Sequence, residues 1–137
     1  MTFRKIDTCM WTKPWFEKLS PNAKLGFVYL WSNDYCNQAG FYTISPDRIN
    51  FDLGYGIDTI YNELDSKVEW FPEKSIVWVK NFFKHQCQNS KFAISALNSI
   101  QQDSFRLQLF IKYNKDILME YKDELEKCKR VYHIDTI

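Results

Sequence analysis

Apolar-rich stretches follow two Ser-Pro pairs, which begin at Ser20 and Ser45. A serine hydroxyl can accept hydrogen bonds from the free N–H groups of a first helical turn, and proline suits the first helical position because no donor is needed there. Each stretch is therefore predicted to be a helix. The second should end at Gly54, since glycine readily adopts the left-handed conformation that closes many helices.

The segment after the Gly54-Tyr55-Gly56 turn carries a further helical pattern. Apolar residues recur there on one helical face, at Ile57, Ile60, Tyr61, Leu64 and Val68. This spacing predicts a helix, with Asp58 as its N-terminal cap. Joined to the Ser45 helix by a tight glycine turn, it would be the second helix of a helix-turn-helix.

Short apolar runs predict three strands, at residues 39–44, 68–71 and 75–79. The last two runs flank Pro72, which suits the second position of a β-turn, so they should form a hairpin. The final run is continuously apolar, which predicts a strand that is covered on both faces. One cover would be the helical core, and the other would be the C-terminal part of the chain.

Together these elements predict an α+β fold that is mostly helical. Their order is helix, strand, helix, turn, helix and hairpin, which is the order of a winged helix-turn-helix. We therefore expect a winged-helix domain over residues 1–88 and a C-terminal helical extension over residues 89–137 that packs on it.

The extension should begin with a helix near Lys91, with Ser90 as its cap, and continue as one long helix from Phe105 to Arg130. A stripe along the long helix follows heptad steps, at Leu107, Ile111, Asn114, Leu118, Tyr121, Leu125 and Cys128. The stripe has two interpretations. We favour packing on its own domain, over Val77 and Val79; the alternative is a homodimer whose register is fixed by Asn114.

Composition limits the partners that the chain can bind. The 137 residues are 45% hydrophobic, enough for one core, and 18 basic against 17 acidic residues leave a net charge of only +1. Nucleic-acid binding would therefore depend on a local cluster of basic residues. The pattern predicts neither a signal peptide nor a membrane span, so we expect a cytoplasmic protein.

No residue pattern indicates catalysis or a bound metal. The cysteines are far apart and form no CxxC pair, so buried free thiols are expected rather than disulfides or a zinc site. His85 and Cys87 lack a second pair of ligands. The sequence also shows no nucleophile associated with either histidine and no glycine-rich phosphate loop. We therefore expect neither enzymatic activity nor a cofactor.

Three stretches carry a resemblance to a known family: "FVYLW", "AGFYTISPDRINFDLG" and "VWVKNFFKHQ". With the tryptophan near the start, they resemble the N-terminal module of phage replisome organisers and DnaD-like primosome proteins, over about residues 3–100. The resemblance implies a winged helix used in replication initiation, which binds DNA, helps to load the helicase, or does both. The separate C-terminal domain of many such proteins has no match here.

Candidate DNA-binding residues lie in four parts of the chain: Arg4 and Lys5 in an N-terminal arm for a minor groove; Thr59, Asn62 and Lys67 on or beside the second helix of the helix-turn-helix; Lys74 at the hairpin turn; and Lys80, Lys84 and His85 after the last strand. Asn62 could bond adenine, and Thr59 could reach a base or a phosphate. However, Asp58, Glu63 and Asp65 bring negative charge to the same helix, which opposes phosphate binding.

The tryptophans are expected to be largely structural. Trp11, Trp15, Trp31 and Trp78 lie in apolar contexts that predict core positions. Trp70, near the hairpin turn, could stack on a base if exposed, although half-buried packing is the interpretation that we favour.

The leading functional hypothesis is a small phage-type replication initiation protein, a winged-helix DNA-binding organiser of the replisome. Its partners would be DNA, bound weakly, and replication proteins such as a helicase or its loader. Two alternatives remain open: a protein-interaction module for helicase loading or assembly with little direct DNA binding, and a transcriptional regulator, which shares the fold.

Overall fold

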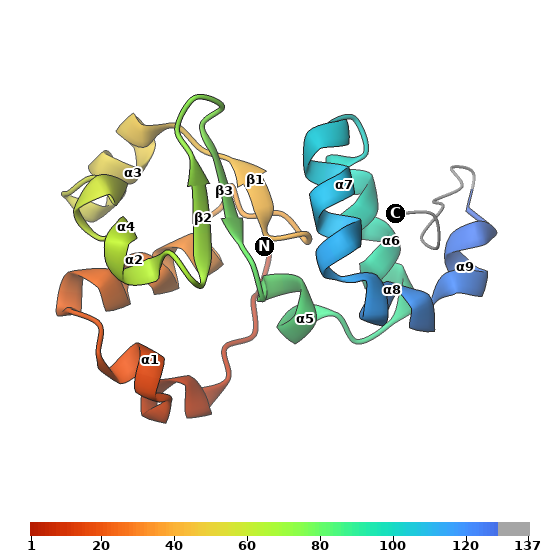
Figure 1. The fold of residues 1–137 in the computed structure, drawn as a ribbon, viewed down its shortest axis with the longest axis horizontal. Coiled ribbons are helices and arrows are strands. Elements are labelled where there is room, and N and C mark those ends of the chain that lie inside the picture. The colour runs from red at the N-terminus through yellow and green to blue at the C-terminus, as the bar shows by residue number, and fades with distance from the viewer. Residues whose placement is uncertain (129–137) are drawn as a thin grey trace.

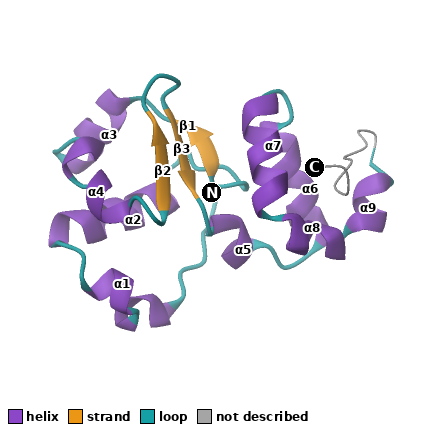
Figure 2. Ribbon diagram, viewed as in Figure 1, coloured by secondary structure: helices purple, strands orange, loops and turns teal. Residues whose placement is uncertain are grey.

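The computed structural model describes residues 1–128 as an α+β fold in which helices lie on both sides of a small sheet (Figures 1 and 2). After a short 3-10 helix at Thr8–Thr12, the helices are α1 (Pro14–Glu17), α2 (Pro21–Ser32), α3 (Pro46–Leu53), α4 (Tyr61–Leu64), α5 (Phe82–Gln86), α6 (Ser90–Ile100), α7 (Ser104–Tyr113), α8 (Lys115–Glu120) and α9 (Lys122–Glu126). The strands are β1 (Phe41–Thr43), β2 (Val68–Phe71) and β3 (Ile76–Val79). Within residues 1–128, no helix has the length and hydropathy that a membrane crossing requires.

The sheet is antiparallel, with strand order β1-β3-β2. The β2 and β3 strands form the predicted hairpin, in which Val68 lies opposite Val79, and β1 pairs with the other edge of β3, with Phe41 opposite Trp78. All four residues of β3 are buried. The prediction that this strand is covered on both faces is therefore confirmed.

Alternate residues of β3 face different cores. Val77 and Val79 belong to a cluster built mainly from the segments before the hairpin, including α1, α2 and α3. Ile76 and Trp78 belong to a second cluster, formed with α5 and with helices α6 to α9 of the extension. The expectation that the extension covers Val77 and Val79 is therefore wrong, because successive side chains of a strand point to opposite faces.

The helix boundaries that depend on local chemistry agree with prediction. The Ser20 hydroxyl accepts from the Ala23 N–H at 3.2 Å, and the Ser45 hydroxyl accepts from the Arg48 N–H at 3.1 Å. Gly54 ends α3 in the left-handed conformation, with φ of 85°. The predicted Ser90 cap is displaced by one residue, since the side chain of Asn89 caps α6.

The predicted helix over residues 57–68 is much shorter in the structure. A 3-10 turn at Ile57–Thr59 is followed by α4, which has only four residues. Val68 leaves the helical pattern and enters β2 because it pairs with Val79, and the chain must turn between Leu64 and Val68 to make that pair. Four residues of the apolar stripe are buried and Tyr61 is half-buried, but they lie on a 3-10 turn, α4 and β2 rather than on one helix.

The predicted long helix from Phe105 is divided into α7, α8 and α9. The chain leaves helical geometry at Asn114 and Tyr121, each with ψ of 19°, and Arg130 lies outside the described residues. Leu118 and Leu125 are fully buried within the same chain. The stripe therefore packs internally, as we favoured, and these side chains are not available for a paired helix.

One tryptophan contradicts its expected position, and the favoured packing of another is confirmed. Trp11 was expected in the core but is 57% exposed, because the 3-10 helix that carries it lies at the surface. Trp70 is buried, with 7% of its surface exposed, so it offers no ring for stacking on a base.

Candidate functional site

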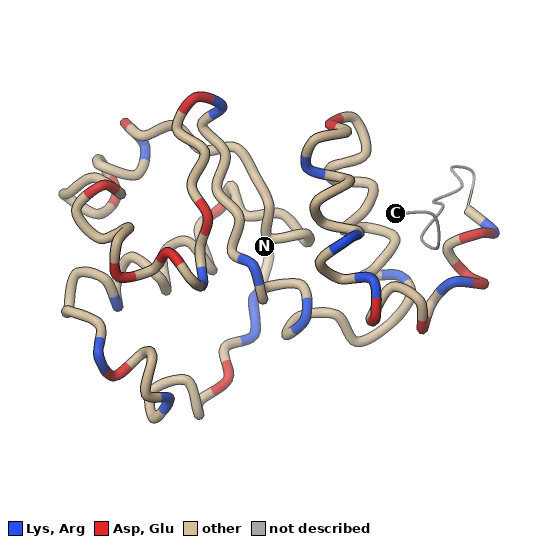
Figure 3. Tube along the Cα trace, in the orientation of Figure 1, with Lys and Arg blue, Asp and Glu red and all other residues tan. Residues whose placement is uncertain are grey.

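Basic side chains gather at the end of the hairpin that lies away from its turn. Lys67 precedes β2 and Lys80 follows β3, and the Lys80 N–H donates to the Lys67 carbonyl at 3.1 Å, which extends the ladder by one step. Lys84 and His85 follow on α5. We call Lys67, Lys80, Lys84 and His85 the basic strip. Figure 3 shows charges of both signs along the whole trace, with basic positions close together where β3 leads into α5.

Tyr113 of α7 links two residues of the basic strip. The centre of its ring is 5.0 Å from Lys80 Nζ and 4.6 Å from Lys84 Nζ, which are cation–π distances. Its hydroxyl donates to Asn81 Oδ1 at 2.8 Å, which fixes the ring beside the end of β3. The Tyr113 ring thus holds two ammonium groups near each other without itself neutralising their charge.

Carboxylates lie beside the same two lysines but pair with them only loosely. Lys80 Nζ is 3.9 Å from Glu69 Oε1, and Lys84 Nζ is 3.8 Å from Asp116 Oδ1. The Asp116 side chain is 74% exposed. Exposed pairs of this kind contribute about 0–1 kcal/mol. The ammonium groups can therefore exchange these partners for another anion at little cost, although the carboxylates weaken the local positive potential.

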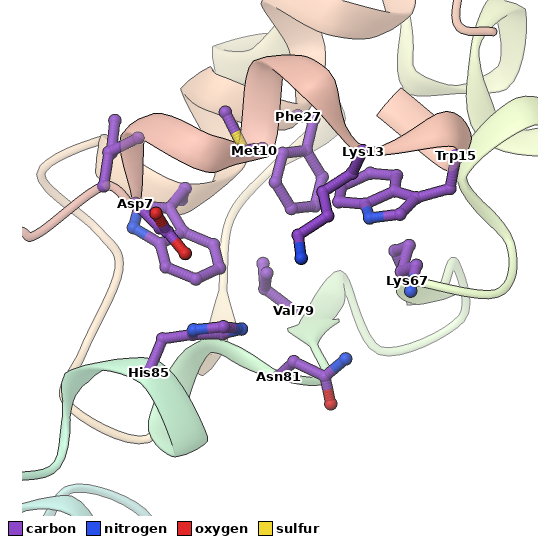
Figure 4. Close-up of a pocket in the computed structure, with 11 residues that line it drawn as sticks. Asp7, Met10, Lys13, Trp15, Phe27, Lys67, Val79, Asn81 and His85 are labelled. Atoms are coloured by element: carbon purple, nitrogen blue, oxygen red, sulfur yellow. The ribbon is translucent and has the colours of Figure 1, made fainter. Parts of the chain in front are cut away.

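A pocket of about 90 Å³ adjoins the basic strip. It lies between the N-terminal segment and the junction of β3 with α5, and Figure 4 shows Lys13 and Trp15 on one side of it and Asn81 and His85 on the other. Its lining residues are Ile6, Asp7, Met10, Lys13, Trp15, Phe27, Trp31, Lys67, Val79, Asn81 and His85. The pocket thus combines an apolar floor with a polar rim.

Lys74 lies at the hairpin turn, at the opposite end of β2 and β3 from the basic strip. Strands of four residues separate the two ends by about 13 Å, at roughly 3.3 Å per residue. Lys74 Nζ is 4.9 Å from the centre of the Phe105 ring at the start of α7. Lys74 is therefore not part of the basic strip, and the extension packs beside the hairpin turn.

The N-terminal basic pair is docked on the fold, so the expectation of a free arm is wrong. Arg4 Nη2 donates to the Cys36 carbonyl at 2.6 Å, and its guanidinium lies 5.4 Å from the Phe82 ring. The Lys5 carbonyl accepts from Trp31 Nε1 at 2.8 Å and from Gln86 Nε2 at 2.7 Å. The buried donors of Trp31 and Gln86 need these acceptors, which holds the segment in place. The Lys5 side chain itself remains exposed.

Thr59 and Asn62 are exposed, but the short α4 limits what they can present. Four helical residues extend only about 6 Å, which is too short for a helix that reads several bases along a groove. The Thr59 hydroxyl donates to the Gly56 carbonyl at 2.8 Å. Asn62 remains a predicted base contact, now on a single helical turn.

Glu63 has a structural partner that the sequence did not indicate. Its carboxylate accepts from the Ser20 N–H at 2.7 Å and from the Ser20 hydroxyl at 2.8 Å, at the N-terminus of α2. These hydrogen bonds hold the pKa of Glu63 below its ordinary value of 4.5. One of the three carboxylates expected to repel DNA thus serves to join α4 to α2.

Sequence reasoning missed Lys13 and Tyr113 as members of this region. Lys13 precedes Pro14 between two tryptophans, and Tyr113 lies outside the heptad stripe of the predicted long helix, so neither carried a local signal. Only the packing of segments distant in sequence brings them beside the hairpin.

Compared with known protein families, curated proteins and solved structures, the chain gives no significant match.

Proposed function

We propose that this chain is a small winged-helix protein of DNA replication initiation, which holds DNA by its phosphate backbone through the basic strip. The element order α2, β1, α3, α4, β2, β3 supports the winged helix, with α3 and α4 as the helix pair and β2 and β3 as the wing. The role in replication is supported by the resemblance of the motifs around Trp31, Gly40 and Lys80 to phage replisome organisers.

The observation that carries the proposal is the convergence of the basic strip. Lys67, Lys80, Lys84 and His85 come from three different elements or their ends. The ladder hydrogen bond joins Lys67 to Lys80 at the backbone, and the Tyr113 ring brings the ammonium groups of Lys80 and Lys84 together, while Lys67 and His85 line the adjoining pocket. Lysine side chains that lie close together can bind neighbouring phosphates of the DNA backbone. The release of counterions from the DNA drives this binding.

The proposed contact is with the backbone rather than with base edges. The one-turn α4 limits base reading, and the carboxylates of Glu69 and Asp116 compete for the lysines. We therefore expect weak binding that depends little on DNA sequence. In the replisome such a protein would act together with a partner, such as a helicase or its loader.

Fluorescence anisotropy with a labelled DNA duplex tests the proposal. The variant Lys80→Ala with Lys84→Ala should bind several duplexes of different sequence about tenfold more weakly than the wild type, because each lost phosphate contact removes a similar share of affinity. Lys18→Ala with Lys91→Ala removes the same charge from exposed positions outside the basic strip and should bind nearly as the wild type does. Equal affinity for both variants would contradict the proposal.

A second candidate function is a protein-interaction module, and one observation favours it. Leu25 on α2 and Phe51 on α3 are 54% and 78% exposed, which is unusual for apolar side chains of this size. If neither double-lysine variant changes DNA binding, this second function becomes the better account. Phe51→Ser then tests it, in assembly assays with replication proteins.

A further inference from the structure

The pocket beside the basic strip has an apolar floor. Phe27 and Val79 are almost fully buried and form its base, while Trp15, half-buried, forms one wall. A volume of about 90 Å³ is far above the roughly 10–15 Å³ that a single water molecule requires. The pocket therefore has room for a group of the size of one apolar side chain.

The rim of the pocket carries more positive than negative charge. Lys13 and Lys67 each place an ammonium group beside it, and the His85 imidazole lies opposite them (Figure 4). The only carboxylate among the described lining residues is Asp7, and it is already engaged, since its Oδ1 accepts from the Cys9 N–H at 2.9 Å. The rim is therefore suited to an anionic ligand.

The aromatic rings of the pocket are not open for stacking. Lys67 Nζ lies 4.8 Å from the centre of the Trp15 ring, so its ammonium covers that ring. Trp31 is 7% exposed and is packed between Phe82, at 5.1 Å, and His85, at 5.8 Å. A nucleic-acid base gains its affinity for such pockets by stacking on a free ring. A base is therefore a poor occupant, despite the positive rim.

We propose that this pocket binds a single apolar side chain from an acidic segment of a partner protein. The side chain would fill the space above Phe27 and Val79, and the flanking carboxylates of the partner would pair with Lys13 and Lys67. Charge complementarity at the rim selects an acidic segment, and the enclosed floor supplies the apolar anchor on which such interfaces depend. This activity goes beyond DNA binding and does not depend on it.

A two-dimensional NMR titration of the uniformly ¹⁵N-labelled full chain tests the proposal. The probe is a peptide with a central phenylalanine flanked on each side by aspartates, and its control has serine at the centre. The indole N–H signal of Trp15 should shift progressively with the phenylalanine peptide. The Trp78 indole, which belongs to the cluster on the other face of β3, should not shift.

A matched pair of variants locates the binding surface. Lys13→Glu should weaken binding of the phenylalanine peptide about threefold to fivefold, because it replaces an attraction at the rim by a repulsion. Lys18→Glu makes the same charge change nearby but outside the pocket, and should bind nearly as the wild type does.

Three results would overturn the proposal. The first is a Trp15 signal that does not move at millimolar concentrations of the phenylalanine peptide. The second is an equal shift with the serine peptide, which would reduce the interaction to general charge attraction. The third is an equal loss of affinity in Lys13→Glu and Lys18→Glu, which would place binding outside the pocket whether or not the chain binds DNA.

Discussion

Gly40 lies just before β1, with φ of 68°, and its carbonyl accepts from the Val79 N–H at 2.8 Å. A Cβ at this position would lie 2.5 Å from the Cβ of Phe82, which is too close for either backbone to accommodate. Gly40→Ala should therefore lower the free energy of unfolding by about 2–4 kcal/mol, from the left-handed backbone together with overpacking. Urea denaturation measures the loss.

Gly54→Ala provides the control for that prediction. Gly54 also has a positive φ, of 85°, but a Cβ there would meet no atom within 4 Å. Gly54→Ala should therefore lower the free energy of unfolding by only about 1 kcal/mol, which is the cost of the left-handed backbone for a residue with a Cβ. If Gly40→Ala cost no more than Gly54→Ala, the close approach between Gly40 and α5 would be contradicted.

At the residue scale, prediction succeeded where the chemistry is local. Ser20, Ser45 and Gly54 act on atoms within a few residues of themselves, so their roles can be read directly from the sequence. The role of Glu63 could not, because its partner Ser20 is 43 residues away. The surface position of Trp11 was missed for the same reason, since burial depends on distant segments.

At the element scale, the contact between Glu63 and Ser20 predicts a pH dependence of stability. Because the folded-state pKa of Glu63 is below its ordinary value of 4.5, the ionised carboxylate stabilises the fold above about pH 4.5. This stabilisation should be lost as the pH falls through the folded-state pKa. Wild type should therefore be more stable than Glu63→Gln at pH 7, and the difference should shrink on acidification.

Thermal unfolding of both proteins between pH 7 and pH 3 measures this difference. Glu17→Gln, at an exposed position on α1, is the charge-matched control. The difference in unfolding temperature between wild type and Glu63→Gln could stay constant with pH, or it could equal the difference for Glu17→Gln. Either result would show that the carboxylate does not join α4 to α2.

The division of the C-terminal helix leads to a second prediction at this scale. Leu118 of α8 is fully buried, so Leu118→Ala should lower the free energy of unfolding by about 2–5 kcal/mol while the mass in light scattering stays unchanged. The neighbouring Met119 is 38% exposed, and Met119→Ala should change stability by less than about 0.5 kcal/mol. A wild-type mass of two chains that fell to one in Leu118→Ala would instead support the paired stripe.

Element types were easier to predict than element lengths. Val68 fits both the helical stripe before it and the strand that it enters, and only its pairing with Val79 decides between them. Likewise, heptad spacing predicts a continuous helix through Asn114, whereas packing against α6 and the sheet requires the chain to bend there. Both errors arise because the apolar periodicity of a segment does not specify the shape of the surface against which that segment packs.

At the scale of the whole molecule, the sheet separates two cores and the two candidate sites lie at one end of it. The pocket collects Lys13, Lys67 and His85 from three separated segments, and the basic strip depends on Tyr113 of the extension. The sequence predicted four of the residues of this region individually. Their grouping with Tyr113 and Lys13 follows only from the tertiary fold, whereas the separation of Lys74 from Lys80 follows from the predicted hairpin.

The salt dependence of DNA affinity tests the central claim most directly, because its slope reports the number of phosphate contacts. Log affinity against log salt concentration should be less steep for Lys80→Ala with Lys84→Ala than for the wild type, by about one to two units. Lys18→Ala with Lys91→Ala should keep the wild-type slope. The same slope in all three proteins would contradict the claim that the basic strip binds the phosphate backbone.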